Sequence, residues 1–185
     1  LGNLASDYTD LGDYQKALEI TKQVVEIQKE VLGERHPDYL TSLSDLAYGY
    51  SDLGDYQKAL EINQKVAEIQ KEVLGDRHPD YIKSLNLIAN VYASLGNYQE
   101  ALEINLKVAE FRKEVLGNHH PDYIKSLNLI AEDYTGLGNY QNAFEIDKQV
   151  VEIRKEVLGE RHPDYLFSLG NLASDYTDLG DYQKA

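Results

Sequence analysis

The sequence repeats itself every 42 residues, and this period constrains the fold more than any other feature. The string Leu-Gly-Asp/Asn-Tyr-Gln begins at Leu11, Leu53, Leu95, Leu137 and Leu179, and His-Pro-Asp-Tyr begins at His36, His78, His120 and His162. Full repeats therefore span 1–42, 43–84, 85–126 and 127–168, and a partial repeat spans 169–185. Repeats of this length are supersecondary units that bury their apolar faces against neighbouring copies. We therefore predict a single repeat array over residues 1–185.

The two ends of the sequence have the same phase within the repeat. Residues 1–17 are identical to residues 169–185, and the sequence contains no methionine. We therefore expect that Leu1 is not a native start. The sequence is interpreted as a segment of a longer array that begins and ends within a repeat.

Composition excludes several classes of protein. The 185 residues carry 18 Lys+Arg and 32 Asp+Glu, a formal net charge of −14, which disfavours nucleic-acid phosphates and anionic membranes as partners. Without cysteine there is no disulfide, Cys-ligated zinc or thiol nucleophile. No apolar run approaches the roughly 18–20 residues of a membrane helix, and no secretory leader is visible. We expect a cytoplasmic protein.

Apolar spacing within one repeat predicts two amphipathic helices. The first has apolar residues at Leu43, Leu46, Ala47 and Tyr50, which is the i, i+3, i+4, i+7 pattern of one helix face. The second, longer helix follows the spacing of Ala59, Ile62, Val66, Ile69 and Val73. Proline at the first helical position and glycine after the last turn predict helices of about 79–94 (helix A) and 98–116 (helix B). No strand pattern is present, so the fold class is all-α.

These residues and motifs resemble the tetratricopeptide repeat over the whole chain. Leu46, Ala47 and Tyr50 match the large, small and aromatic positions of its helix A, and Ala59 matches the small position of helix B. The repeat departs from the family in its length of 42 rather than 34 residues. It departs also in the residues that replace the family's helix-B aromatic, which are Thr21, Asn63, Asn105 and Asp147. The long form, with its Leu-Gly-x-x-His-Pro-Asp-Tyr linker, is similar to the repeats of kinesin light chain.

The resemblance implies a right-handed superhelical solenoid of antiparallel helix pairs. It also implies a non-catalytic scaffold whose concave face, lined by helix A, binds a peptide or protein partner. No cofactor is expected. The positions of helix A that vary between repeats are the candidates for a partner-binding groove: Tyr48, Lys83, Asn86, Asn90, Lys125, Asn128 and Glu132. Asparagine amides can pair with an extended backbone, and lysine can pair with a carboxylate. The alternative is that these positions are ordinary solvated side chains.

Metal binding and catalysis are disfavoured by the spacing of the titratable residues. Equivalent histidines of successive helix pairs would lie about 9–10 Å apart, too far to share a metal ion, so the four linker histidines are interpreted as N-caps of helix A. The acidic run from Ser6 to Asp13 lacks the spacing and the bidentate glutamate of a calcium loop. The repeated His and Asp have no Ser or Cys partner at a fixed offset, so no enzyme activity is expected.

The chain ends support a second hypothesis. No polar capping helix is visible at either end, and solenoids need such caps. Apolar residues should therefore be exposed at the ends, among them Leu1, Leu4, Leu169, Leu172 and Tyr176. Because all repeat interfaces are similar, the chain could form a homo-oligomer, end to end or by exchange of terminal helices. A third hypothesis is that the chain is a spacer that binds no ligand.

Overall fold

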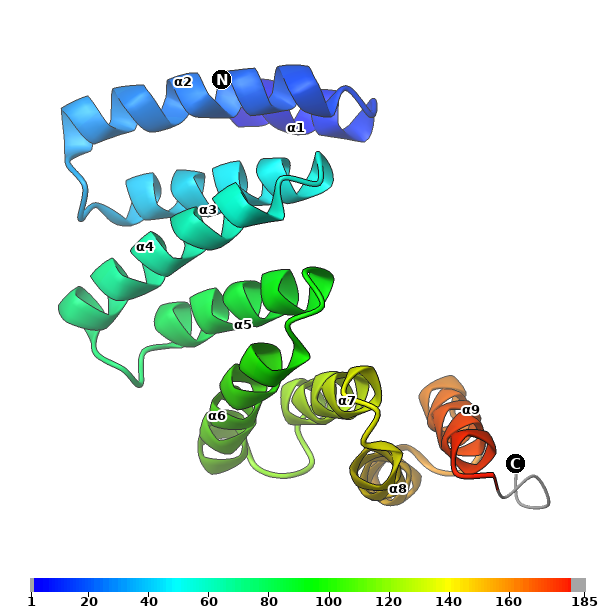
Figure 1. Ribbon diagram of the computed structural model, residues 1–185. Coiled ribbons are helices and arrows are strands. Elements are labelled where there is room, and N and C mark those ends of the chain that lie inside the picture. Colours follow the sequence, from blue (N-terminus) through cyan, green and yellow to red (C-terminus); the bar gives the residue numbers. More distant parts are fainter. Residues whose placement is uncertain (1, 181–185) are drawn as a thin grey trace. The chain divides into compact units, whose positions relative to one another are not determined.

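A computed structural model describes residues 2–180, without the side chains of residues 2, 3 and 6. Over this range the chain forms nine α-helices and no strand (Figure 1). The helices are α1 (Gly2–Asp10), α2 (Tyr14–Leu32), α3 (Pro37–Asp52), α4 (Tyr56–Leu74), α5 (Pro79–Ser94), α6 (Tyr98–Leu116), α7 (Pro121–Gly136), α8 (Tyr140–Leu158) and α9 (Pro163–Asp178). Odd-numbered helices correspond to helix A and even-numbered helices to helix B, which confirms the all-α class.

The repeated linker residues determine where the helices begin and end. His78 precedes α5, and its Nδ1 accepts a hydrogen bond from the backbone N–H of Asp80 at 3.2 Å. The same bond forms at the other three linker histidines, which confirms their interpretation as N-caps. Gly75 ends α4 at φ 90°, where a residue with a Cβ would be strained. The observed bounds of α5 and α6 agree with those expected from the caps.

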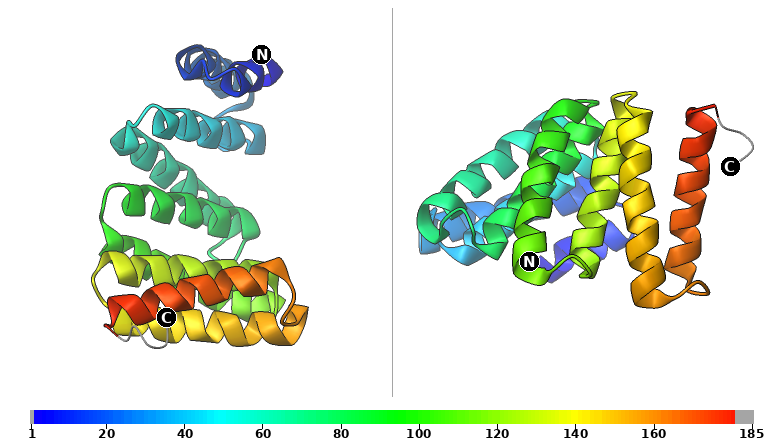
Figure 2. Two further views of the ribbon diagram at one scale, coloured as in Figure 1. Left: turned by 90° about the vertical axis from the view of Figure 1, so that its right-hand side faces the viewer. Right: turned by 90° about the horizontal axis from the view of Figure 1, so that it is seen from below.

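The helices group into two compact units, Leu1–Leu95 and Gly96–Ala185, here called the N-terminal and C-terminal units. Within the N-terminal unit each helix from α1 to α5 packs on the next one along the chain (Figures 1 and 2). Its core joins α2, α3 and α4 through Leu18, Leu40, Leu43 and Val66. Ile69 of α4 packs against the same cluster.

The C-terminal unit contains α6 to α9, which also pack in chain order (Figure 2). Its core joins α6, α7 and α8 through Leu102, Ile124, Ile130 and Val150. Ile130 is 1 % exposed and Val150 is 1 % exposed. The periodic apolar pattern therefore produces the same type of core in both units.

One apolar residue expected on the core stripe of helix B lies outside the core. Val73 is 48 % exposed and its neighbour Leu74 is 41 % exposed. Both lie in the last turn of α4, whereas Ala59 and Val66 are fully buried. The long form of helix B thus carries an exposed apolar last turn. None of the helices in the described range is long and apolar enough to span a membrane.

Candidate functional site

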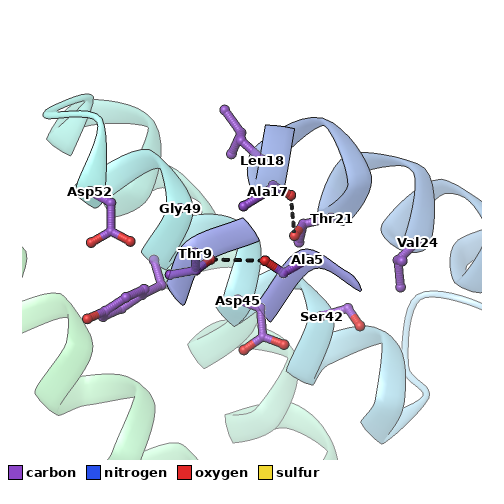
Figure 3. Close-up of a pocket in the computed structure, with 11 residues that line it drawn as sticks. Ala5, Thr9, Ala17, Leu18, Thr21, Val24, Ser42, Asp45, Gly49 and Asp52 are labelled. Atoms are coloured by element: carbon purple, nitrogen blue, oxygen red, sulfur yellow. Dashed lines mark hydrogen bonds between the residues drawn. The ribbon is translucent and has the colours of Figure 1, made fainter. Parts of the chain in front are cut away.

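Three cavities lie along the helix-A side chains of the N-terminal unit. The first, of about 260 Å³, is lined by α1, α2 and α3 and is shown in Figure 3. The second (about 320 Å³) and the third (about 270 Å³) are lined mainly by α3, α4 and α5. Asp45 of α3 lines all three cavities. The surface around it is called the Asp45 face and consists of Ser44, Asp45, Tyr48, Lys83, Leu87 and Asn90.

Asp45 is the charged centre of this face. Figure 3 shows its side chain and that of Asp52 on α3, among the residues of α1, α2 and α3 that line the first cavity. Partial burial raises the pKa of Asp45, and the positive charge of Lys83 on α5 partly offsets this rise. Asp45 and Lys83 therefore present opposite charges within the second and third cavities. An extended peptide carries both hydrogen-bond donors and acceptors that can pair with such groups.

The third cavity also contains an unpaired polar atom. Asn63 of α4 is 4 % exposed, and its Oδ1 is buried without a hydrogen-bond partner among the described residues. Tyr48 and Asn90 line the same cavity, and Tyr48 is 62 % exposed.

Three of the expected groove residues line one cavity of the N-terminal unit. Tyr48, Lys83 and Asn90 line the third cavity. Asn86 lines none of the three, and its Nδ2 donates to the Ile82 carbonyl of its own helix at 3.0 Å.

The remaining expected groove residues belong to α7 of the C-terminal unit. Lys125 and Glu132 are exposed, and Asn128 is half-buried, with no partner for its Oδ1 in the part of the chain that the structure describes. Partial burial raises the pKa of Glu132.

The residue that sequence reasoning missed is Asp45. Its position in the repeat is occupied by Asn3, Leu87, Leu129 and Asn171 in the other copies. The sequence did contain one indication of a functional role: Asp45 is charged, whereas the other repeats have leucine or asparagine at this position. Its place among three cavities depends on the packing of α1, α3 and α5, which the sequence pattern does not give.

The residues expected at exposed ends have mixed environments. Leu4 is 45 % exposed and Leu169 is 37 % exposed. Leu172 and Tyr176 are half-buried, and the Tyr176 ring lies edge-to-face against Phe144 of α8 with 4.9 Å between centroids. Leu1 lies outside the described residues.

Each unit is built from helix pairs that recur with a 42-residue register, which defines the class of α-helical repeat proteins. The tetratricopeptide-repeat model matches residues 1–72, 47–114, 82–141 and 122–185. The chain therefore belongs to the tetratricopeptide-repeat family. No curated protein sequence matches the chain significantly.

Solved structures with similar folds include long-repeat proteins. A protein of Podosopora anserina described as a kinesin light chain with nearly identical TPR-like repeats is 34 % identical with a TM-score of 0.90, over 99 % of this chain and 86 % of its own. BtubC (BKLC) from P. vanneervenii is 21 % identical with a TM-score of 0.84, over 98 % of this chain and 72 % of its own. A Rap protein complexed with Competence and Sporulation Factor is 15 % identical with a TM-score of 0.70, over 100 % of this chain and 49 % of its own. The last two likenesses concern the fold alone.

Proposed function

We propose that the chain is a non-catalytic scaffold that binds an extended peptide or a protein segment on the Asp45 face. The observation that carries this proposal is that three cavities of the N-terminal unit are all lined by Asp45. The face offers an exposed aromatic ring and two opposite charges. The Rap complex shows that a protein with a similar fold can hold a second molecule.

The test is the selection of peptides from a random displayed library against the 185-residue chain. The affinity of a selected peptide is then measured by fluorescence anisotropy. Replacing Tyr48, Lys83 and Asn90 together with Ala should weaken binding by at least about tenfold, because three contacts at roughly 0.5–1.5 kcal/mol each are lost. The matched control replaces Gln57, Glu61 and Glu68 of α4, which are exposed and line none of the three cavities.

Circular dichroism checks that both triple variants keep their helicity. The proposal is wrong if no peptide is enriched, or if a selected peptide binds the cavity variant as tightly as the control. A further variant, Lys125→Ala with Asn128→Ala, asks whether α7 contributes. Unchanged binding in that variant would restrict the site to the N-terminal unit.

A second candidate function is self-association of the 185-residue chain, and a comparison of equivalent residues favours it. Leu166 of α9 is 55 % exposed, whereas its equivalents Leu40, Ile82 and Ile124 are 5 %, 7 % and 6 % exposed. On α2, Ile27 is 51 % exposed, whereas its equivalent Ile153 is 8 % exposed. Leu166 therefore occupies a position that is buried in the other repeats, and Ile27 occupies one that is buried or partly buried in them.

Contacts between helices inside the array indicate which residues would meet in a contact between two copies of the chain. Leu40 and Ile69 pack in one core cluster, and Ile124 and Ile153 pack in another. In each pair the second residue follows the first by 29 positions. If α9 of one copy packs on α2 of a second copy in this register, Leu166 meets Ile27. Residues 169–178 are identical to residues 1–10, so α9 can replace α1 in its packing on α2.

Light scattering at high micromolar concentration tests self-association. The 185-residue chain should form oligomers, and Leu166→Glu or Ile27→Glu should each reduce the mass to that of a monomer. An equimolar mixture of these two variants should form dimers only, because each variant keeps one intact surface. Val115→Glu, at a position that is 56 % exposed, is the control and should leave oligomers intact. A monodisperse wild-type monomer would contradict this function without affecting peptide binding.

A further inference from the structure

Two carboxyl groups face each other across the contact between α8 and α9. Asp147 of α8 is 6 % exposed and Asp175 of α9 is 5 % exposed. The contact between the two carboxyls raises the pKa of Asp147 and lowers that of Asp175, as is expected when two acids share a proton. The Oδ2 of Asp175 is buried without a partner among the described residues. A buried acid pair is therefore part of the packing of the last described helix.

The other repeats place different residues at these two positions. Asn105 and Asp133 are the equivalent pair between α6 and α7, and Asn105 Nδ2 donates to Asp133 Oδ2 at 2.7 Å. The equivalent residues of α4 and α5 are Asn63 and Val91, and those of α2 and α3 are Thr21 and Gly49. Two acids meet only between α8 and α9 among these four described pairs. The contact of α9 therefore differs from its three counterparts in the need for a shared proton.

The charges around the pair do not replace that proton. Glu132 of α7 and Asp178 of α9 add negative charge. Arg154 of α8 is the nearby cation, but its Nη1 donates to the Asp164 carbonyl and to Ser168 Oγ, both at 3.0 Å. Asp133 of α7 is held by Asn105. His162 caps the N-terminus of α9 and is a further titratable group of that helix.

We propose that α9 packs on α8 in a proton-dependent manner: the Asp147–Asp175 pair holds α9 in place while it shares a proton, and α9 is released when both carboxyls ionise. Two adjacent buried carboxylates repel each other and lose their hydrogen bond. The released segment is Pro163–Asp178, whose Tyr165 and Ser168 are otherwise buried. The C-terminal unit thus contains a helix whose docking responds to pH near neutrality.

The direction of the response follows from the titration of the pair. Burial, followed by the charge of Asp175, raises the pKa of Asp147 to about 7. Burial also raises the pKa of Asp175. Because the packed state then binds more protons than the released state, packing of α9 weakens as the pH rises from about 4 to 7 and stays weak above 7. Acidification below neutrality restores it.

Hydrogen exchange measured by mass spectrometry tests the proposal on the full 185-residue chain. After correction for the intrinsic exchange rate, protection of 163–178 should fall by at least about tenfold between pH 5.5 and 8.5. Protection of α7 peptides should fall less. Asp147→Asn copies the Asn105–Asp133 pair and should reduce the fall in α9 protection to the smaller fall expected for α7. The reciprocal variant Asn105→Asp should make the protection of α7 fall with pH in the same way.

Two further results decide between this pair and the histidine. His162→Asn keeps a capping side chain and should leave the pH response of α9 unchanged. If this variant abolishes the response, the histidine and not the acid pair controls α9. The proposal is also overturned if wild-type α9 protection is independent of pH, or if Asp147→Asn retains the wild-type fall.

Discussion

Equivalent positions bury neutral groups in the N-terminal unit and ionisable groups in the C-terminal unit. Asn63 and Val91 line one cavity in the N-terminal unit, whereas Asn105 bonds to the acid Asp133 in the C-terminal unit. A second pair of positions shows the same contrast. Ser84 Oγ donates to Gln70 Oε1 at 2.7 Å, whereas Arg112 Nη1 donates to Ser126 Oγ at 2.6 Å.

This contrast shows that the same arrangement of helices can bury either neutral or ionisable side chains at equivalent positions. The apolar stripe and the helix caps are repeated in both units, so they determine the helices and their order. The buried polar pairs are free to change, because each pair contacts only two neighbouring helices. We therefore expect stability to depend on pH in the C-terminal unit and much less in the N-terminal unit.

The largest effect on stability is expected from introducing a buried acid into the N-terminal unit. Val91→Asp places a carboxyl opposite Asn63 at a position that is 6 % exposed. At pH 8 the free energy of unfolding should fall by about 2–3 kcal/mol, because a charge is buried and valine packing is lost. At pH 4 the loss should be smaller, because the acid is protonated. Urea denaturation at both pH values measures the difference, and Val91→Asn is the uncharged control. Equal losses at the two pH values would contradict the comparison.

The converse change should remove the contribution of Asp133 to the pH dependence of the C-terminal unit. Burial raises the pKa of Asp133 to about 6 from an ordinary value of 3.8, although the Asn105 hydrogen bond lowers it. The native state therefore binds more protons than the unfolded state between these values, and stability falls as the pH rises through them. Relative to wild type, Asp133→Asn should gain about 1–3 kcal/mol between pH 4 and pH 7. Thermal melts over this range test it, and a difference that stays constant would show that Asp133 is ionised throughout.

A smaller effect is expected from exchanging the interhelical arginine. Arg112→Ala removes the bonds to Ser126 Oγ and to the Asp122 carbonyl, at 2.6 and 3.2 Å. Since Ser126 is 1 % exposed, the loss should be about 1–2 kcal/mol. Arg112→Gln copies Gln70 and should cost less than about 1 kcal/mol, as glutamine can still bond to the serine. If glutamine costs as much as alanine, the two units are not interchangeable at this position.

The smallest effect concerns the N-caps of helix B. Asp55 of the N-terminal unit accepts a hydrogen bond from the Lys58 N–H at 3.3 Å, whereas Asn97, which immediately precedes α6, makes no such bond. Asp55→Ala should therefore lower the melting temperature by about 2–4 °C. Asn97→Ala should leave it within about 1 °C, because no side-chain cap is lost. Differential scanning calorimetry compares the two, and equal shifts would show that Asn97 caps α6 in solution.

The sequence pattern predicted the helices but not the exposure of every apolar residue. The Pro79 and Gly75 positions gave the bounds of the helices because proline and glycine act on the local backbone. Val73 was expected on the core stripe and is 48 % exposed. Periodicity assigns a residue to a face of a helix, but burial depends on whether a neighbouring helix extends far enough to cover that turn.

The sequence by itself determined the family, the repeat register and the capping role of the histidines, because all of these depend on residues close together in the chain. Only the tertiary structure decided which polar residues meet. Asp147 and Asp175 are 28 positions apart on different helices, and Asp45 joins three cavities through the packing of α1 to α5. Side-chain contacts between helices depend on how the helices pack, and the same 42-residue spacing permits a neutral, a mixed or an acidic pair at that contact.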